Sequence, residues 1–144
     1  MEREILFRGI PVNQNLFKII DDKEVPCFIE GGFYRDYCYG GCPEGEDYII
    51  SYNSTGFGFN DFTLCIKETI EQFTGLRDKD GVKIFEGDII KRIDSDTKFI
   101  VVFNGGSFCV QDSENLHHNL GLLDSISNYS TIVGNIHQNK ELIL

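Results

Sequence analysis

The amino-acid sequence predicts a mainly β protein, with an N-terminal β-sheet subdomain, a small, partly open C-terminal β-barrel of the Src-homology-3-like type, and one or two short helices. Two observations support this fold class. The 144 residues include 12 Phe and 6 Tyr but no Ala, a balance that suits the pleated surface of a sheet and disfavours long helices. In addition, short apolar runs alternate with turns rich in Gly, Asn and Asp, which is typical of antiparallel strands.

The N-terminal subdomain is expected to cover residues 1–68. Short apolar runs predict strands over residues 4–10, 25–30 and 47–52. Pro11 limits the first strand. Pro26 should lie either on an edge strand or among the first residues of the second strand, because proline has no backbone N–H to donate. The stretch 31–45 is rich in Gly, Tyr and Cys, which indicates a long hairpin or a protruding loop.

The C-terminal barrel is expected to cover residues 69–144, where the strand signals are clearer. Strands are predicted over residues 70–76, 82–93, 99–103, 107–111 and 131–137, and a short helix is predicted within 112–124. Asp80-Gly81 and Asn104-Gly105-Gly106 are turn sequences of hairpins. Gly87 should bend the long second strand, because glycine adopts backbone conformations that other residues avoid.

The chain is acidic, with a formal net charge of −10. Residues 21–47 alone carry eight acids against two bases, a net of −6. Non-specific binding to nucleic acid depends on clustered Lys and Arg, so this composition disfavours it. Met1–Arg8 does not resemble a signal peptide, and no apolar run is long enough to span a bilayer. The sequence therefore predicts a cytoplasmic protein with free thiols.

One segment carries a specific motif. Thr74–Ile90 reads TGLRDKDGVKIFEGDII, and it resembles the central motif of the YopX family of phage and prophage proteins. Arg3–Gly9 is similar to the opening of many members, and Val133–His137, with Asn139, Glu141 and Leu142, is similar to their closing segment. The resemblance implies a phage-borne, β-rich protein that is not known to be enzymatic and has no established molecular function.

The motif also has a purely structural interpretation, which we favour. Asp78 and Gly81 are expected to make a turn, and Gly87 is expected to permit a bend. The apolar members Ile84, Phe85, Ile89 and Ile90 are expected to point into a core.

No cofactor, metal or catalytic centre is predicted. Cys38 and Cys42, with Cys27 upstream, form the best zinc candidate, but a closed structural site needs four ligands, so free thiols explain them better. His117 and His118 lie near Asp112, Glu114 and Cys109 in sequence, an arrangement that chance explains as well as a nucleophile with its base. We therefore expect a protein that is not an enzyme.

The predicted function is protein binding, with an unknown host or phage partner or a second copy of the chain. Candidate contact residues are aromatic and flanked by glycines: Phe33, Tyr34, Tyr37, Tyr39, Phe57 and Phe59. Edge strands over 25–30 and 131–137 are candidates for pairing between copies in a homo-oligomer. The alternative is a nucleic-acid-binding module that uses the basic residues Arg77, Lys79, Lys83, Lys91, Arg92 and Lys98.

Overall fold

The chain forms two compact units, Glu4–Gln72 and Phe73–Leu144, in a computed structural model that describes residues 4–12, 17–20, 23–26, 28–36, 45–52, 60–115 and 121–143. Strand β7 (Glu71–Arg77) runs from the N-terminal unit into the C-terminal one. The sequence suggests a boundary near residue 68, a few residues before this division.

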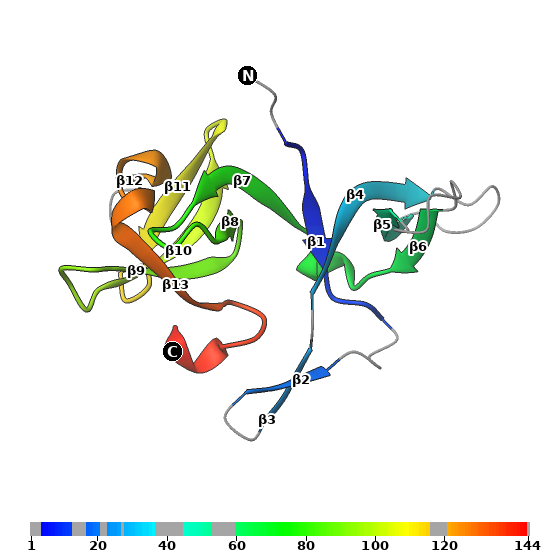
Figure 1. The fold of residues 1–144 in the computed structure, drawn as a ribbon, viewed down its shortest axis with the longest axis horizontal. Helices are drawn as coiled ribbons and strands as arrows, with labels where there is room; N and C mark the ends of the chain where they lie inside the picture. The colour runs from blue at the N-terminus through cyan, green and yellow to red at the C-terminus, as the bar shows by residue number, and fades with distance from the viewer. Residues whose placement is uncertain are drawn as a thin grey trace. The chain divides into compact units, whose positions relative to one another are not determined.

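The N-terminal unit contains an antiparallel sheet in the order β6-β5-β4-β1, and the first residues of β7 pair with β1 (Figure 1). Its elements are β1 (Phe7–Gly9), β2 (Phe17–Ile20), β3 (Lys23–Pro26), β4 (Ile29–Asp36), β5 (Glu46–Tyr52), β6 (Asn60–Leu64) and the 3₁₀ helix η1 (Lys67–Thr69). Strands β2 and β3 form a separate hairpin.

Two ion pairs connect neighbouring strands of this sheet. Arg8 and Glu71 face each other across β1 and β7, with 2.7 Å between Nη2 and Oε2. Arg35 and Asp47 face each other across β4 and β5, with 2.9 Å between Nη2 and Oδ2. Both carboxylates are buried, so loss of either arginine would remove the cation that faces a buried carboxylate. These pairs therefore fix the register of the strands that carry them.

The C-terminal unit contains a five-stranded antiparallel sheet in the order β12-β11-β10-β9-β13, together with the β7–β8 hairpin. Its elements are β8 (Lys83–Phe85), β9 (Asp88–Arg92), β10 (Lys98–Asn104), β11 (Ser107–Asp112), β12 (Gly121–Leu122), η2 (Leu123–Ser125), η3 (Ser127–Tyr129), β13 (Ser130–Asn135) and η4 (Lys140–Leu142). In Figure 1 the orange segment contains η2 and η3, which lead from β12 to β13.

One hydrophobic core holds this unit together. Its buried members come from β8, β9, β10, β11 and η2, and they are Ile84, Ile90, Val101, Val110 and Leu123. Because Ile84 belongs to the β7–β8 hairpin and the others to the five-stranded sheet and its connection, the hairpin packs against the sheet. Among the described residues, β12 and β13 are the two outer strands of this sheet and do not pair with each other. The strand pairing of the described residues therefore does not close a barrel.

The turn after β7 is built around the carboxylate of Asp78. Its Oδ1 accepts hydrogen bonds from the backbone N–H groups of Asp80 (2.9 Å) and Val82 (3.0 Å). Its Oδ2 accepts one from Ile132 (3.3 Å), which lies 54 positions later on β13. Gly81 adopts a φ of 81°, which favours glycine. The predicted turn of the motif is confirmed, and the same side chain also fastens this turn to β13.

The second half of the motif follows the structural interpretation. Gly87 has a φ of 81° and turns the chain between β8 and β9, where a bend was predicted. The four apolar side chains expected in the core, Ile84, Phe85, Ile89 and Ile90, are all buried. The Asp88 carboxylate is buried as well, and its Oδ2 accepts a hydrogen bond from the backbone N–H of Phe85 at 2.8 Å.

The structure confirms the mainly β class and revises one predicted strand. The predicted strand over 25–30 is divided, because β3 ends at Pro26 and β4, which begins at Ile29, lies between β1 and β5 in the sheet. The helix predicted within 112–124 falls partly outside the described residues. Within the described part, the Asp112 carboxylate accepts a hydrogen bond from the backbone N–H of Glu114 in a local turn, and Leu123–Ser125 forms the 3₁₀ turn η2. The helices of the described residues are single 3₁₀ turns, and none of them could span a membrane.

The first prediction concerns Asp78. Replacement by Ala removes the acceptor of three backbone N–H groups, so D78A should lower the free energy of unfolding by about 3 kcal/mol. The matched control is D80A, since the Asp80 carboxylate is exposed and pairs with Lys79; D80A should cost less than about 0.5 kcal/mol. Urea titration measures both changes. Equal losses in the two variants would contradict the anchoring role of Asp78.

The second prediction concerns Glu86, which lies in the turn between β8 and β9. Burial raises the pKa of its carboxyl, and a hydrogen bond from the backbone of Phe103 offsets part of the increase. A carboxyl with a raised pKa in the folded state contributes stability at low pH that is lost as the pH rises through that pKa. E86Q should therefore melt at a higher temperature than the wild type at pH 7, and this advantage should vanish below about pH 4. Thermal melts across this range test it, and an advantage that persists at low pH would exclude an ionisation effect.

Candidate functional site

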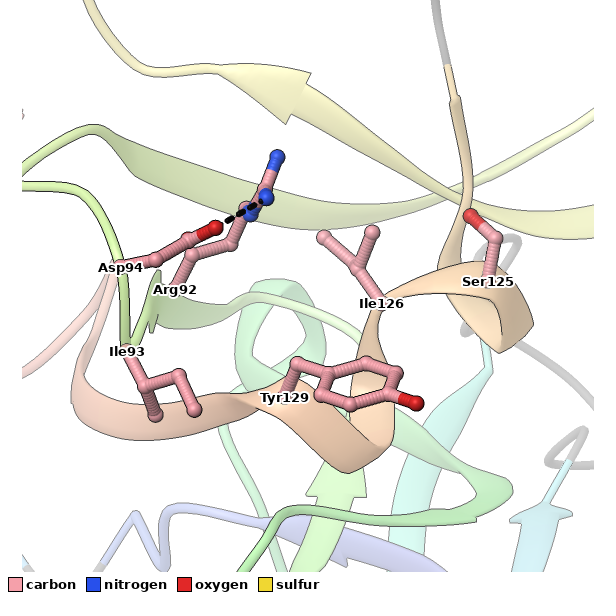
Figure 2. Close-up of a pocket in the computed structure, with 6 residues that line it drawn as sticks. All are labelled: Arg92, Ile93, Asp94, Ser125, Ile126 and Tyr129. Atoms are coloured by element: carbon pink, nitrogen blue, oxygen red, sulfur yellow. Dashed lines mark hydrogen bonds and ion pairs between the residues drawn. The ribbon is translucent and has the colours of Figure 1, made fainter.

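A surface pocket of about 480 Å³ lies within the C-terminal unit, where the end of β9 meets the segment that contains η2 and η3. Its lining residues are Arg92, Ile93, Asp94, Ser125, Ile126 and Tyr129. Figure 2 shows the Arg92–Asp94 pair along one side and Ile93 and Tyr129 along the other, with Ile126 between them. The pocket thus combines three apolar or aromatic side chains with one ion pair and the hydroxyl groups of Ser125 and Tyr129.

Backbone hydrogen bonds hold the two walls of the pocket together. The N–H of Ile93, just after β9, donates to the carbonyl of Tyr129 at 2.9 Å. The 3₁₀ turns are closed by Ile126 N–H on Leu123 O and by Tyr129 N–H on Ile126 O, each at 3.0 Å. The buried hydroxyl of Ser130 also donates to Ile126 O, at 2.8 Å. Hydrogen bonds to backbone carbonyls therefore hold the main chain of Ile93, Ile126 and Tyr129 in place around the pocket.

The floor and the walls of the pocket differ in burial. Ile126 is half-buried and packs against the hydrophobic core, and the neighbouring Leu123 is fully buried within it. By contrast, Ile93 is 61% exposed and Tyr129 is 62% exposed. Large apolar groups that remain exposed beside a depression are the kind of surface that partner proteins cover.

Polar groups occupy the rim of the pocket. Nη2 of Arg92 lies 2.6 Å from Oδ2 of Asp94, and both side chains are largely exposed. The hydroxyl of Ser125 donates to the carbonyl of Leu122 at 2.7 Å. A guanidinium has five N–H donors, so one bond to Asp94 leaves Arg92 with further capacity. The arrangement can hold an apolar side chain in the centre and a charged or polar group at the edge.

The predicted aromatic candidates are only partly described. Phe33 lies on β4, 37% exposed, with its ring centroid 5.4 Å from that of Phe7 and with the Arg35 guanidinium 5.6 Å from it. The backbone of Tyr34 follows Phe33 on the same strand. The remaining candidates, Tyr37, Tyr39, Phe57 and Phe59, lie outside the described residues. A role for these aromatic residues in binding stays a prediction.

The predicted basic candidates fall into three places. Arg77 and Lys83 face each other across the β7–β8 hairpin, with both charges within 6 Å of the Phe73 ring centroid. Lys79 pairs with Asp80 in the following turn. Lys91 and Lys98 face each other across β9 and β10, and Arg92 lines the pocket.

Acidic side chains accompany several of these bases. Lys91 lies 2.6 Å from Asp96 and lowers the pKa of that carboxyl through a hydrogen bond and its charge, with a smaller contribution from Lys98. Together with the Lys79–Asp80 and Arg92–Asp94 pairs, this contact reduces the positive charge available to a phosphate backbone. Three of the six predicted basic residues, Lys79, Lys91 and Arg92, are thus each paired with a carboxylate.

The described cysteines are buried. Burial raises the pKa of the Cys65 thiol, a backbone hydrogen bond from Ile49 opposes the shift, and the charge of Asp47 adds to it. Cys109 is also a free, buried thiol. The zinc candidates Cys27, Cys38 and Cys42, and the histidines His117 and His118, lie outside the described residues. Within the part of the chain that the structure describes, His, Cys, Asp and Glu side chains form no group suited to a metal ion.

Comparison with known proteins gives the family. The family model described as "YopX protein" matches residues 34–144, more than three-quarters of the chain. The chain belongs to the YopX family. The YopX match includes the Asp78 turn, the whole five-stranded sheet and every residue that lines the pocket.

Two further comparisons add little about function. A solved structure described as protein EF1440 from Enterococcus faecalis is 25% identical, and the alignment covers 99% of this chain and 100% of that one, with a TM-score of 0.48. No curated protein matches the chain.

Sequence reasoning identified only Arg92 among the pocket residues. Ile93 follows β9 as a single apolar residue before the polar run Asp94-Ser95-Asp96, and Tyr129 stands in the polar stretch 127–131. An isolated large apolar residue in a polar loop is a weak signal, because such residues are common on protein surfaces. Only the hydrogen bond between Ile93 and Tyr129 reveals that the two belong to one surface.

The third prediction is that the rim charges of the pocket contribute little to folding. Exposed ion pairs are worth at most about 1 kcal/mol. R92Q and D94N should therefore each change the free energy of unfolding by less than about 1 kcal/mol, and the double variant should show a coupling of similar size. Urea titration of the three variants and the wild type measures this double-mutant cycle. A larger loss of unfolding free energy would mean that the Arg92–Asp94 pair stabilises the fold and is not only a surface contact.

Proposed function

We propose that this chain is a non-enzymatic accessory protein of a phage or prophage that acts in the bacterial cytoplasm by binding another protein. The observation that carries the proposal is the pocket of the C-terminal unit, in which exposed Ile93 and Tyr129 flank an apolar floor. Binding energy at protein interfaces is concentrated in a few buried side chains, with Tyr strongly represented. A partner that covered this pocket would bury such a centre within a polar rim.

The architecture of the C-terminal unit supports this placement. We infer a partly open barrel of the Src-homology-3-like type, since the β7–β8 hairpin and the five-stranded sheet share one core. Ile90 and Arg92 are two positions apart on β9 and therefore lie on the same face. Ile90 is in the core and Arg92 is at the pocket, so the pocket lies where the core side of the sheet reaches the surface. Mouths of β-barrels are common binding sites.

A homo-oligomer is the special case in which the partner is a second copy of the chain. Strand β13 is an outer strand of the sheet, as self-pairing requires. However, two backbone groups on the outward side of β13 are already bonded within the unit. The N–H of Lys79 donates to the carbonyl of Ser130, and the N–H of Ile132 donates to the Asp78 carboxylate. Contact through the pocket therefore suits self-association better than strand addition at β13.

Binding of nucleic acid is the alternative function. The cross-strand pair of Lys91 and Lys98 is the observation that favours it, while the acidic partners of Lys79, Lys91 and Arg92 and the net charge of −10 oppose it. Affinity for nucleic acid should fall steeply as the salt concentration rises, because phosphate contacts release counterions. Recognition of a protein through Ile93 and Tyr129 should be much less sensitive to salt.

The fourth prediction tests the pocket as the contact surface. The protein carries a photo-activated cross-linking amino acid in place of Tyr129 and is irradiated in lysate of the bacterial host, with and without nuclease treatment. We expect a discrete protein adduct at position 129. Placing the same group at Val82, which is 52% exposed in the same unit, supplies the control. With the partner identified, Y129A and I93A should each weaken binding about tenfold or more, with little change in the melting temperature.

The outcomes separate the proposed functions. An adduct at position 129 and none at position 82 supports the pocket as a protein contact. Adducts of equal yield at both positions would indicate non-specific contact and reject it. Loss of the adduct upon nuclease treatment would favour the nucleic-acid alternative.

A further inference from the structure

We propose that the pocket recognises a basic side chain, Arg or Lys, next to an apolar side chain of the partner protein. This inference rests on the proposed function and specifies the chemistry of the partner at the same site. The apolar side chain would cover Ile126 between Ile93 and Tyr129, and the basic group would pair with the Asp94 carboxylate at the rim. Three features of the pocket support this choice of charge.

The first feature is the unused capacity of Asp94. Arg92 contacts only Oδ2 of this carboxylate, and among the described residues no hydrogen bond to Oδ1 is found. A carboxylate can accept several hydrogen bonds at its two oxygens. A basic group of the partner can therefore bind Asp94 without displacing Arg92.

The second feature is the ring of Tyr129. The ring borders the pocket and is 62% exposed, so that much of its surface is available. A guanidinium or ammonium group is attracted to the face of an aromatic ring, most strongly where water is excluded. A carboxylate gains no such attraction. The ring and the Asp94 carboxylate thus favour the same sign of charge.

The third feature is the charge around the pocket. Among the lining residues Arg92 is the cation and Asp94 is the anion. The exposed Asp124 does not line the pocket, but it directly precedes the lining residue Ser125 in η2. The C-terminal unit has seven basic and ten acidic residues between positions 73 and 144, a net of −3, and the complete chain has −10. Negative potential attracts a basic segment and repels an acidic one during association.

The size of the pocket sets the length of the recognised segment. A volume of about 480 Å³ accommodates a few side chains rather than a folded domain. The expected determinant is therefore a short stretch of chain with one apolar and one basic residue close together. Exposed loops and termini of a partner present such stretches.

The experiment is selection of a displayed random peptide library on the wild-type protein, with counter-selection on the Y129A/I93A double variant. We expect selected peptides to share a Lys or Arg within one or two positions of a large apolar residue. Peptides that depend on the pocket but carry acidic or uncharged residues would overturn the charge assignment and leave the protein-binding function intact. No pocket-dependent peptide at all would count against both.

Point variants then test the charge assignment with one labelled peptide from the selection. D94N should weaken its binding about two- to fivefold, because a rim ion pair is lost. R92Q should strengthen binding by a similar factor, since a cation that repels the basic group is removed. D80N, a change to an exposed carboxylate outside the pocket, is the control for net charge. The opposite signs for D94N and R92Q would show that the partner is acidic, and equal effects of D94N and D80N would indicate only long-range attraction.

Discussion

The C-terminal unit depends on the buried carboxylate of Asp78. One oxygen closes the turn between β7 and β8, and the other accepts a hydrogen bond from Ile132 on β13. A local turn is thereby connected to a strand that lies more than fifty positions later in the chain. Because the same side chain serves both contacts, the β7–β8 hairpin cannot shift relative to β13 without losing hydrogen bonds to a charged acceptor, which are the stronger kind.

A second buried carboxylate repeats this arrangement at the other end of β13. Asp88 accepts a hydrogen bond from Phe85 in the turn between β8 and β9, and its Oδ1 lies 3.4 Å from Nδ2 of Asn135. The N–H of Asn135 donates to the side chain of Asn139. The two buried acids of the YopX motif, Asp78 and Asp88, are thus engaged in structural hydrogen bonds. These two carboxylates have little capacity left for a ligand, which is why the functional surface is sought elsewhere.

These hydrogen bonds also influence how a partner can bind. An outer strand with free N–H and C=O groups invites strand addition. On β13 the outward N–H of Ile132 and the carbonyl of Ser130 are already bonded within the unit. Recognition through side chains is the remaining mode on this part of the surface. Exposed Tyr129, which directly precedes β13, and Ile93, whose N–H donates to the Tyr129 carbonyl, supply such side chains.

The sequence predicts well those features that depend on neighbouring residues. Gly105 and Gly106, with φ of 60° and 82°, make the predicted hairpin turn between β10 and β11, and Gly87 makes the predicted bend. Asp112 shows the limit of such reasoning, because a helix N-cap and an isolated turn use the same side-chain hydrogen bond. Nothing in the local sequence distinguishes the two.

The pocket could not be predicted because its residues meet only in the folded chain. Ile93 and Tyr129 are 36 positions apart, and the hydrogen bond that joins them follows from the pairing of β9 with β13, not from either loop. Arg92 was identified for its charge alone, in a set chosen for nucleic acid. Its carboxylate partner Asp94 makes it part of a different surface, in which the charge is compensated and the apolar side chains supply most of the area. The neighbours of Arg92 therefore assign it to the rim of the pocket and not to a phosphate contact.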